Sequence, residues 1–511
     1  MTFAGGSTNS GSDTPLDDSP RDREIPWSEL RHDRILQIIL LAALVLRMWN
    51  ISWGLPDATH RWPYHPDETN LFMGLAAFPP TFHPYDIAWG GSFFCLYGFH
   101  TLLGGLIGLF PLTKSASLFQ HDPGALNCLY LWNRSLTVLL AWVSIMGLYL
   151  LARRLGSSRR GARIAALLFG ITPFSVLHAH YLTVHTLTAF MAIAALLAFA
   201  GRTRPFATGF FGAATAGCEY SFGALWFGLA AVMLTRTRKD FLRFGSGSLL
   251  ALPLFFSILL DPRGWWLALA EQKKFIQPGA HGPWFYMDVA GPATSYMLLA
   301  AGITGMAWAF RSQHRRAVLF VMILQTLALG VLGNPFARRF AFFYPCLAVC
   351  IGLMLEKIRR PPVRRILVAM LLVEPLLRSV ALVQGLTSCD TRTLARAAVE
   401  SVVPAGERIA VQNWFFAPHI STTRYRIVAN PLGLIPVDSD IWCLTSERNG
   451  PSPEELREAG WSEVARIERP HEFLNFPFHD AEWPEDLRYT NPTIHLFRRH
   501  ADTAPASTDN E

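Results

Sequence analysis

The sequence predicts an α-helical membrane protein that crosses a bilayer about eleven times and ends in a small external α/β domain. Three observations support this fold class. Hydrophobic residues make up 51% of the 511 residues and charged residues only 16%, whereas soluble proteins contain about 25% charged residues. Apolar stretches of the length that crosses a bilayer as a helix, about 17–25 residues, recur along the chain. From about residue 387 onwards the composition becomes that of a soluble domain.

The chain begins with 33 residues rich in Gly, Ser, Thr and Asp, which indicate a disordered cytoplasmic tail, 1–33. This tail is too polar for a cleaved signal peptide, so the first apolar segment is expected to remain as a membrane anchor. The transmembrane domain should span 34–386. Its apolar segments lie at 34–53, 92–111, 130–151, 162–178, 186–200, 206–217, 221–235, 244–260, 290–310, 317–334, 339–355 and 365–386.

The basic residues predict the orientation of these segments. The net charge is +7, but Lys and Arg are gathered in short clusters between apolar segments, which argues against nucleic-acid binding. Loops rich in Lys and Arg face the cytoplasm, so the basic tail and five basic loops should lie inside. These loops hold 19 Lys and Arg residues and lie at 152–163, 201–205, 236–243, 311–316 and 356–365.

One apolar segment must not cross the bilayer if all five basic loops face the same side. With the tail inside, a crossing by 34–53 followed by another at 92–111 would place every later basic loop outside. Segment 92–111 contains a histidine and four glycines and ends in Pro111. We therefore expect a juxtamembrane or re-entrant helix there, within an external loop 54–129.

The C-terminal residues, 387–511, are expected to form a soluble α/β domain outside the inner (plasma) membrane, on the periplasmic side of a bacterial cell. "SCDTRTLARAAVESVVPAGERIAVQ" predicts an amphipathic helix, a Pro-Ala-Gly turn and a strand. "IPVDSDIWCLTSER", "PSPEELREAGWSEVARIER" and "TIHLFRR" predict further short strands and one more helix.

With this topology, ionisable residues gather on the external side. Such groups are costly at membrane depth unless they face a water-filled or protein-lined cavity, so we expect a cavity that opens outward. The residues expected around it are His65, Asp67, Glu68, His83, Tyr85, Asp86, Arg134, His178, His180, His185, Glu219, Lys273, Lys274, His281, Arg338 and Arg339.

Asp67 and Glu68 follow Pro66, which ends any helix at His65 and places Asp67 near a new helix start. One interpretation is an acidic N-cap and first turn. The other is a general base aimed into the cavity, opposite cationic groups suited to an anionic phosphate leaving group. The second interpretation predicts transfer from a lipid-phosphate donor.

Several of these residues also have simpler interpretations. Lys273 and Lys274 can be solvated loop charges or can extend toward lipid phosphates. His178, His180 and His185 could bind a divalent metal with Asp67, since imidazole and carboxylate suit such ions. Their spacing defines no ligand set, so we expect no cofactor.

The motif "PDET" at Pro66–Thr69 resembles the acidic motif of C-type (GT-C) membrane glycosyltransferases, in the bacterial branch related to protein O-mannosyltransferases and the lipid A aminoarabinose transferase. Residues 149–190 and "NPFARRFAFFYPCLAVCIG" are similar to that family at the level of pattern, over roughly residues 34–386. The resemblance implies a polyprenyl-phosphate sugar donor and inversion at the anomeric carbon. It also implies that Asp67 is the catalytic carboxylate, Glu68 its neighbour, and Arg338 or Arg339 a phosphate contact.

Two positions depart from the family pattern. His185 stands where these enzymes usually have an Asp, and Glu219 where they usually have a Lys. One account is that the two residues touch, so that the pair has inverted as a unit and the carboxylate stabilises the protonated ring. The other is that a phosphate or acceptor contact was lost. Side chains within about 4 Å would support the pair.

A membrane transporter or a non-catalytic membrane protein is the alternative function. Transporters show paired repeats and broken helices in matching halves, and the sequence has no clear internal repeat. The polar residues also gather at one face rather than at mid-membrane, which favours the enzyme. The sugar and the acceptor cannot be predicted from the sequence.

Overall fold

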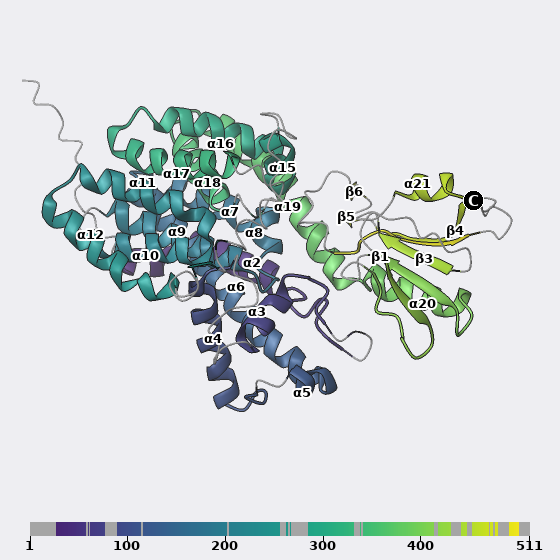
Figure 1. The fold of residues 1–511 in the computed structure, drawn as a ribbon. Helices are drawn as coiled ribbons and strands as arrows, with labels where there is room; N and C mark the ends of the chain where they lie inside the picture. The colour runs from purple at the N-terminus through teal and green to yellow at the C-terminus, as the bar shows by residue number, and fades with distance from the viewer. Residues whose placement is uncertain are drawn as a thin grey trace, which may run out of the picture.

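The computed structural model consists of a helical part and a C-terminal domain built on a β-sheet, connected by the long helix α19 (Pro361–Thr387) (Figure 1). The helical part contains every helix before this connection, and the C-terminal domain starts with a helix at Thr391. The residues that the structure describes are 27–57, 60, 62–76, 89–113, 116–201, 204–255, 262–263, 266, 285–331, 338, 341–412, 417–430, 441–446, 452–469, 471–473, 476–478 and 490–499.

Some helices in the first half of the helical part start after a residue whose side chain caps the helix. The side chain of Asp122 accepts a hydrogen bond from the backbone N–H of Ala125, and Pro123 occupies the first helical position, where its missing N–H costs nothing. These helices are α1 (Trp27–His32), α2 (Arg34–Met48), α3 (Glu68–Ala76), α4 (Gly91–Leu106), α5 (Ala116–His121), α6 (Pro123–Arg154), α7 (Arg159–Gly170), α8 (Pro173–Leu177), α9 (Val184–Ala200) and α10 (Pro205–Cys218).

The second half packs back onto the first. Gly161 of α7 and Gly352 of α18 face each other so closely that a Cβ on Gly161 would lie 2.7 Å from the carbonyl oxygen of Gly352. Only glycine allows this backbone approach. The elements of this half are η1 (Tyr220–Phe222), α11 (Gly223–Leu234), α12 (Arg238–Leu250), η2 (Leu252–Phe255), α15 (Phe285–Thr294), α16 (Tyr296–Ala309), α17 (Gln313–Val331), α18 (Phe343–Leu355) and α19.

The expectation of about eleven crossings is not confirmed. Among the described residues, two helical stretches are long and apolar enough to cross a membrane, Pro123–Arg154 and Pro361–Val402. Other apolar segments form helices of 10–17 residues, and a helix of 14 residues is only about 21 Å long, against a hydrocarbon core of about 30 Å. These shorter helices are Val184–Ala200, Tyr220–Leu234, Tyr296–Ala309 and Phe343–Leu355.

Segment 92–111, which we expected not to cross, forms the 16-residue helix α4. Its first half is buried at Phe93, Phe94 and Tyr97, whereas Leu106 and the following Ile107 are 66% and 65% exposed. The helix therefore has one anchored end and one exposed apolar end. Its position relative to a membrane stays a prediction.

The C-terminal domain contains a mixed five-stranded sheet with the strand order β2-β1-β3-β7-β4. Strand β1 runs parallel to β2 and β3, and β7 runs antiparallel to β3 and β4. The predicted mixture of short strands and two helices is therefore confirmed. The elements are α20 (Thr391–Val402), β1 (Arg408–Gln412), β2 (Arg426–Asn430), β3 (Ile441–Ser446), α21 (Pro453–Glu458), β4 (Trp461–Ile467), β5 (His471–Phe473), β6 (Phe476–Phe478) and β7 (Ile494–Arg499).

Candidate active site

The predicted catalytic residues lie at the start of α3. The turn before this helix is held by hydrogen bonds from Glu68 N to the His65 carbonyl (3.2 Å) and from the Thr69 hydroxyl to the Pro66 carbonyl (2.8 Å). The N–H of Asp67 also points at Nδ1 of His65, at 3.3 Å. Asp67 thus stands immediately before the first residue of the helix, as the position of Pro66 indicated.

Asp67 forms an ion pair with Arg338. Nη1 of Arg338 donates to Oδ2 of Asp67 at 2.7 Å, and the two side chains are 23% (Asp67) and 14% (Arg338) exposed. These residues are 271 positions apart in the chain, yet the fold brings together a carboxylate and a guanidinium that solvent still reaches. The sequence predicted a carboxylate opposite a cationic group, and the structure has that arrangement.

Glu68 and Arg134 have a different environment. Their side chains are fully buried, with Nε and Nη2 of Arg134 donating to the two carboxylate oxygens of Glu68 at 2.8 and 2.6 Å. Glu68 also accepts the backbone N–H of Leu182, and Arg134 donates to the carbonyls of Ile51 and Trp53. Such a bidentate pair is strong and geometrically specific. The pair and its backbone contacts therefore link α3 to α6, to the residues that follow α2 and to the turn before α9.

This geometry suits a structural role for Glu68 and Arg134, both of which we expected to face the cavity. The partners that the structure gives to Arg134 are protein carboxylate and carbonyl oxygens, and none of its side chain is exposed. The sequence could not distinguish a structural role from a role in the cavity, because the same charged residue at a helix end can face either a cavity or another helix.

His185 and Glu219 touch. Nδ1 of His185 lies 3.3 Å from Oε2 of Glu219, and the two side chains are 4% and 3% exposed. The other oxygen of Glu219 accepts from the Ser221 hydroxyl at 2.9 Å. The distance is below the limit of about 4 Å set for a pair, so the predicted contact between the two departing positions is confirmed.

Two further predicted histidines, His65 and His180, are also fully buried. Both ring nitrogens of His180 lie at hydrogen-bond distance from backbone carbonyls, of Val176 at 2.9 Å and of Trp49 at 3.0 Å. His65 packs against Tyr181, with ring centroids 4.2 Å apart. Burial first of all, and then neighbouring cationic groups including Arg338, hold the pKa of His65 well below its usual value of 6.5. Its ring is therefore neutral beside Asp67.

No metal site emerges in the described part of the chain. There, no group of three or more His, Cys, Asp or Glu side chains is arranged to hold an ion. His178 and His185 lie with ring centroids 5.6 Å apart, but their rings meet edge to face.

Several expected residues lie outside the described residues. They come from the external loops that the sequence analysis placed around the cavity, so the structure neither supports nor opposes their roles. These residues are His83, Tyr85, Asp86, Lys273, Lys274, His281 and Arg339.

The sequence indicated no role for Arg392. This residue of the C-terminal domain contacts the segment that precedes Asp67. Arg392 is 1% exposed and pairs with Asp390 through Nε at 2.8 Å and Nη2 at 3.0 Å. Its Nη1 donates to the Tyr64 carbonyl at 2.9 Å, and its guanidinium lies 4.0 Å from the centre of the Tyr64 ring. The Tyr64 hydroxyl is 2.7 Å from that of Thr393. Residue 64, three positions before Asp67, is thus fixed by the C-terminal domain.

Two buried arginines therefore position the segment that carries Asp67, Arg134 from α6 and Arg392 from α20. Buried charges of this kind require partners, and here each guanidinium binds both a carboxylate and backbone carbonyls. The result is a rigid support beneath one accessible carboxylate–guanidinium pair. Chemically, that pair offers a proton acceptor and an anion-binding group at the same place.

No family model and no curated protein sequence matches the chain. Its structural neighbours are GT-C membrane glycosyltransferases at low sequence identity. ArnT from Cupriavidus metallidurans, bound to undecaprenyl phosphate, is 12% identical over 92% of this chain and 99% of its own length, with a TM-score of 0.48. The Archaeoglobus fulgidus oligosaccharyltransferase, in complex with Zn and sulfate, is 16% identical over 78% of this chain, with a TM-score of 0.47.

The chain spans only 62% of that oligosaccharyltransferase. A third similar structure, the protein O-mannosyltransferase complex of S. cerevisiae bound to its sugar donor, is 15% identical over 50% of this chain and 36% of its own length, with a TM-score of 0.34. At TM-scores below 0.5, such likenesses carry no information on substrate or mechanism.

Proposed function

We propose that this protein is an integral membrane glycosyltransferase that moves a sugar from a polyprenyl-phosphate donor to an acceptor hydroxyl on the outer face, by inverting displacement. The observation that supports this most is the pair formed by Asp67 and Arg338, 2.7 Å apart and open to solvent. The donor class comes from the resemblance of Pro66–Thr69 to the acidic motif of GT-C enzymes.

The proposed reaction needs one base and one anion-binding group. Asp67 takes the proton of the acceptor hydroxyl as its oxygen attacks the anomeric carbon from the face opposite the phosphate. The bond between that carbon and the phosphate oxygen breaks, and the polyprenyl phosphate leaves with the electron pair. Arg338 stabilises the negative charge that grows on the phosphate.

The pairing of Asp67 with Arg338 fits both roles. A guanidinium has five N–H donors in a planar fork, so it can contact a carboxylate and a phosphate together. In the structure Nη1 serves the carboxylate. The other N–H groups of the guanidinium can then donate to the donor phosphate, whose negative charge weakens the pull of Arg338 on Asp67 and leaves the carboxylate better able to accept a proton.

The contact between His185 and Glu219 supports the account in which two charges have exchanged as a unit. Where similar enzymes have Asp and Lys, this chain keeps a buried contact between a carboxylate and a group that can be positively charged. A buried pair that keeps its sign balance maintains the electrostatics around the site without an unpaired charge. We therefore propose that the pair lines the substrate site and that the reaction is retained.

The experiment that tests the proposal is turnover by the purified full chain with a panel of polyprenyl-phosphate sugars and a hydroxyl acceptor. We expect transfer from at least one donor, release of polyprenyl phosphate, and a product with inverted anomeric configuration by NMR. A product that retains the anomeric configuration would contradict direct displacement. Absence of transfer from every donor, with a folded protein, would contradict the proposed function.

A further inference from the structure

Helix α12 (Arg238–Leu250) has one packed face and one open face. The packed face lies against α10, where a Cβ on Gly209 would overlap the Phe244 carbonyl and a Cβ on Gly247 would overlap the Phe206 carbonyl. Phe244 is buried in this contact. The two glycines thus let the helices touch through their backbones, and this contact fixes which residues of α12 point away from the protein.

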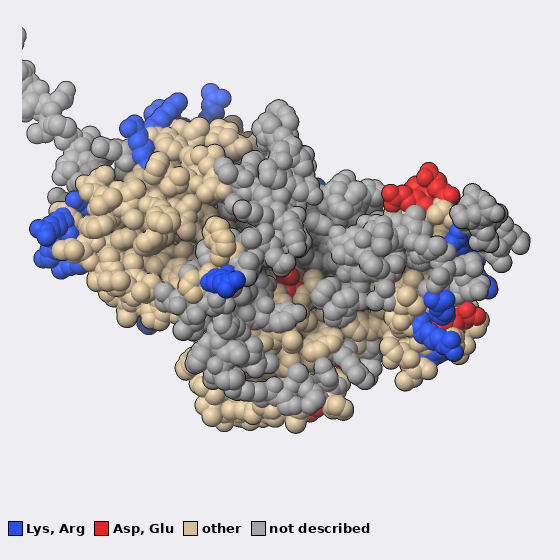
Figure 2. Space-filling view, in the orientation of Figure 1, with Lys and Arg blue, Asp and Glu red and all other residues tan. Residues whose placement is uncertain are grey.

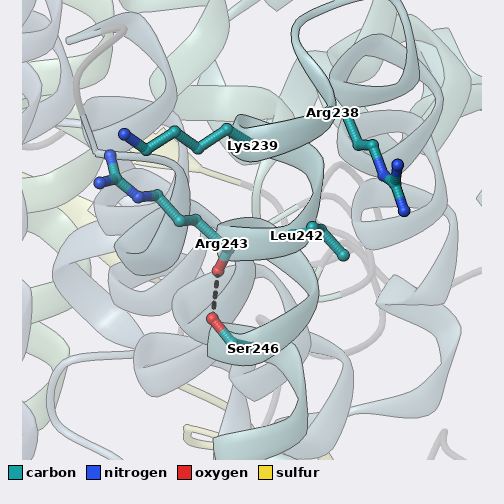
Figure 3. A pocket seen from close by; sticks show the side chains of 5 residues that line it. All are labelled: Arg238, Lys239, Leu242, Arg243 and Ser246. Atoms are coloured by element: carbon teal, nitrogen blue, oxygen red, sulfur yellow. Dashed lines mark hydrogen bonds between the residues drawn. The ribbon is translucent and has the colours of Figure 1, made fainter.

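The open face of α12 is basic near the start of the helix and apolar near its end. Its first half borders an open hollow of about 540 Å³, lined by Arg238, Lys239, Leu242, Arg243 and Ser246. In Figure 2, Lys and Arg side chains gather at the end of the helical part where Figure 1 places α12. Three leucines of α12 are also exposed: Leu242 at 61%, Leu249 at 67% and Leu250 at 61%. Figure 3 shows Leu242 on the side of the helix to which Arg238 points.

Two cations converge within this hollow. Lys239 and Arg243 are four residues apart, one helical turn, and Figure 3 shows both side chains pointing to the same side of α12, whereas Arg238 points to the other side. Among the described residues, neither Lys239 nor Arg243 has an ion-pair partner, although Asp240 lies on the same helix. Like charges at this spacing repel each other, so the arrangement calls for an anion.

We propose that the open face of α12 binds the headgroup of an anionic glycerophospholipid, with Lys239 and Arg243 contacting the phosphate and the exposed leucines contacting the acyl chains. Lys239 and Leu250 are separated by roughly 16 Å along the helix axis at 1.5 Å per residue. If the headgroup is bound at Lys239, its acyl chains therefore extend along α12 toward Leu249 and Leu250. The binding does not depend on the reaction proposed above.

A lipid fits this surface better than a soluble phosphate does. A soluble anion would use only the two cations, and the exposed Leu249 and Leu250 at the end of the same helix would gain nothing from its binding. In a membrane the same leucines contact lipid chains and the cations lie at headgroup level. The sequence supports this placement, because 236–243 is one of the basic loops and 244–260 is an apolar segment.

The test is native mass spectrometry of the purified full chain with dioleoylphosphatidylglycerol, dioleoylphosphatidylcholine and soluble glycerol 3-phosphate. We expect the wild type to retain phosphatidylglycerol in preference to phosphatidylcholine, and glycerol 3-phosphate not to displace it. Each direct contact between an exposed basic side chain and the lipid phosphate is worth up to about 1 kcal/mol, about a fivefold change in affinity. The double variant K239Q/R243Q should therefore bind phosphatidylglycerol up to roughly 25-fold more weakly, and R243K should bind it nearly as well as the wild type.

The matched control is R359Q/R360Q, which removes two exposed arginines from another basic loop with the same change in net charge. This control should retain the preference for phosphatidylglycerol. The substituted side chains of α12 are exposed, so unfolding temperatures close to the wild type are expected for every variant. Equal lipid binding by K239Q/R243Q and the wild type would overturn the site. Tight binding of glycerol 3-phosphate would overturn the assignment to a lipid.

Discussion

Replacement of Glu68 by Gln should destabilise the protein strongly. The variant keeps the shape of the side chain but removes the charge that faces the fully buried guanidinium of Arg134. It also places an amide nitrogen where Nε or Nη2 of Arg134 now donates to a carboxylate oxygen. Breaking a buried ion pair by removing one partner typically costs about 3–5 kcal/mol, because the other charge stays buried.

The other hydrogen bonds around Glu68 and Arg134 keep the loss of unfolding free energy in Glu68→Gln within about 3–5 kcal/mol. The amide oxygen of Gln can still accept the N–H of Leu182, and Arg134 can still donate to the carbonyls of Ile51 and Trp53. The backbone around the pair therefore keeps its partners. The loss is electrostatic, with no cavity of the kind that Ala would leave.

The assay is thermal unfolding of the purified full chain, followed by tryptophan fluorescence. The matched control is Glu468→Gln, just after β4, whose side chain is 44% exposed and whose partner Arg466 is 52% exposed. That exposed pair should contribute less than about 1 kcal/mol. Equal unfolding temperatures for the two variants would refute the structural role of Glu68. Below its unfolding temperature, Glu68→Gln should lose less turnover than a variant of Asp67.

Three further predictions concern other parts of the molecule. His185→Ala and Glu219→Gln should each lower stability or turnover, and the double variant should be milder than the sum of the two, because their side chains are 3.3 Å apart; additive effects in this cycle would mean that the contact contributes nothing. Burial raises the pKa of Glu463, but hydrogen bonds from His495 and Arg457 outweigh it and hold the pKa below the usual 4.5. Its contribution to stability should therefore be complete above about pH 4.5 and be lost as the pH falls further, and pH titration of unfolding should show a smaller acid loss for Glu463→Gln. A cysteine introduced at Thr113 should react with an impermeant reagent from outside the cell, and labelling from the cytoplasm alone would contradict the proposed topology.

Local signals in the sequence predicted the helical character of the chain and the α/β part after residue 387, whereas the number of crossings is not confirmed. Pro66 followed by two carboxylates indicated a helix start, and α3 begins at Glu68. The amphipathic pattern after residue 387 predicted a helix whose Ala395 and Val399 are indeed buried. These features depend on neighbouring residues and on periodicity, which the sequence displays directly.

The candidate site was only partly predictable. The predicted topology placed Asp67 and Arg338 around the same cavity, and the change of charge at two positions indicated the contact between His185 and Glu219. Arg392 gave no such signal, because an arginine near the start of an amphipathic helix usually faces solvent. Its burial depends on a contact with Tyr64, which is 328 residues away. Pairings over such distances depend on the tertiary fold and leave no local pattern.

The most direct test of the central claim compares Asp67→Asn with Asp57→Asn, two identical changes in the loop 54–129 that we expect to be external. Asp57 is 54% exposed and pairs with His60 rather than with Arg338. Rates of sugar transfer from the preferred polyprenyl-phosphate donor should fall by about 100-fold or more for Asp67→Asn, the scale expected for loss of a general base. Asp57→Asn should keep nearly the rate of the wild type. Transfer by Asp67→Asn at the wild-type rate would contradict the assignment of Asp67 as the base.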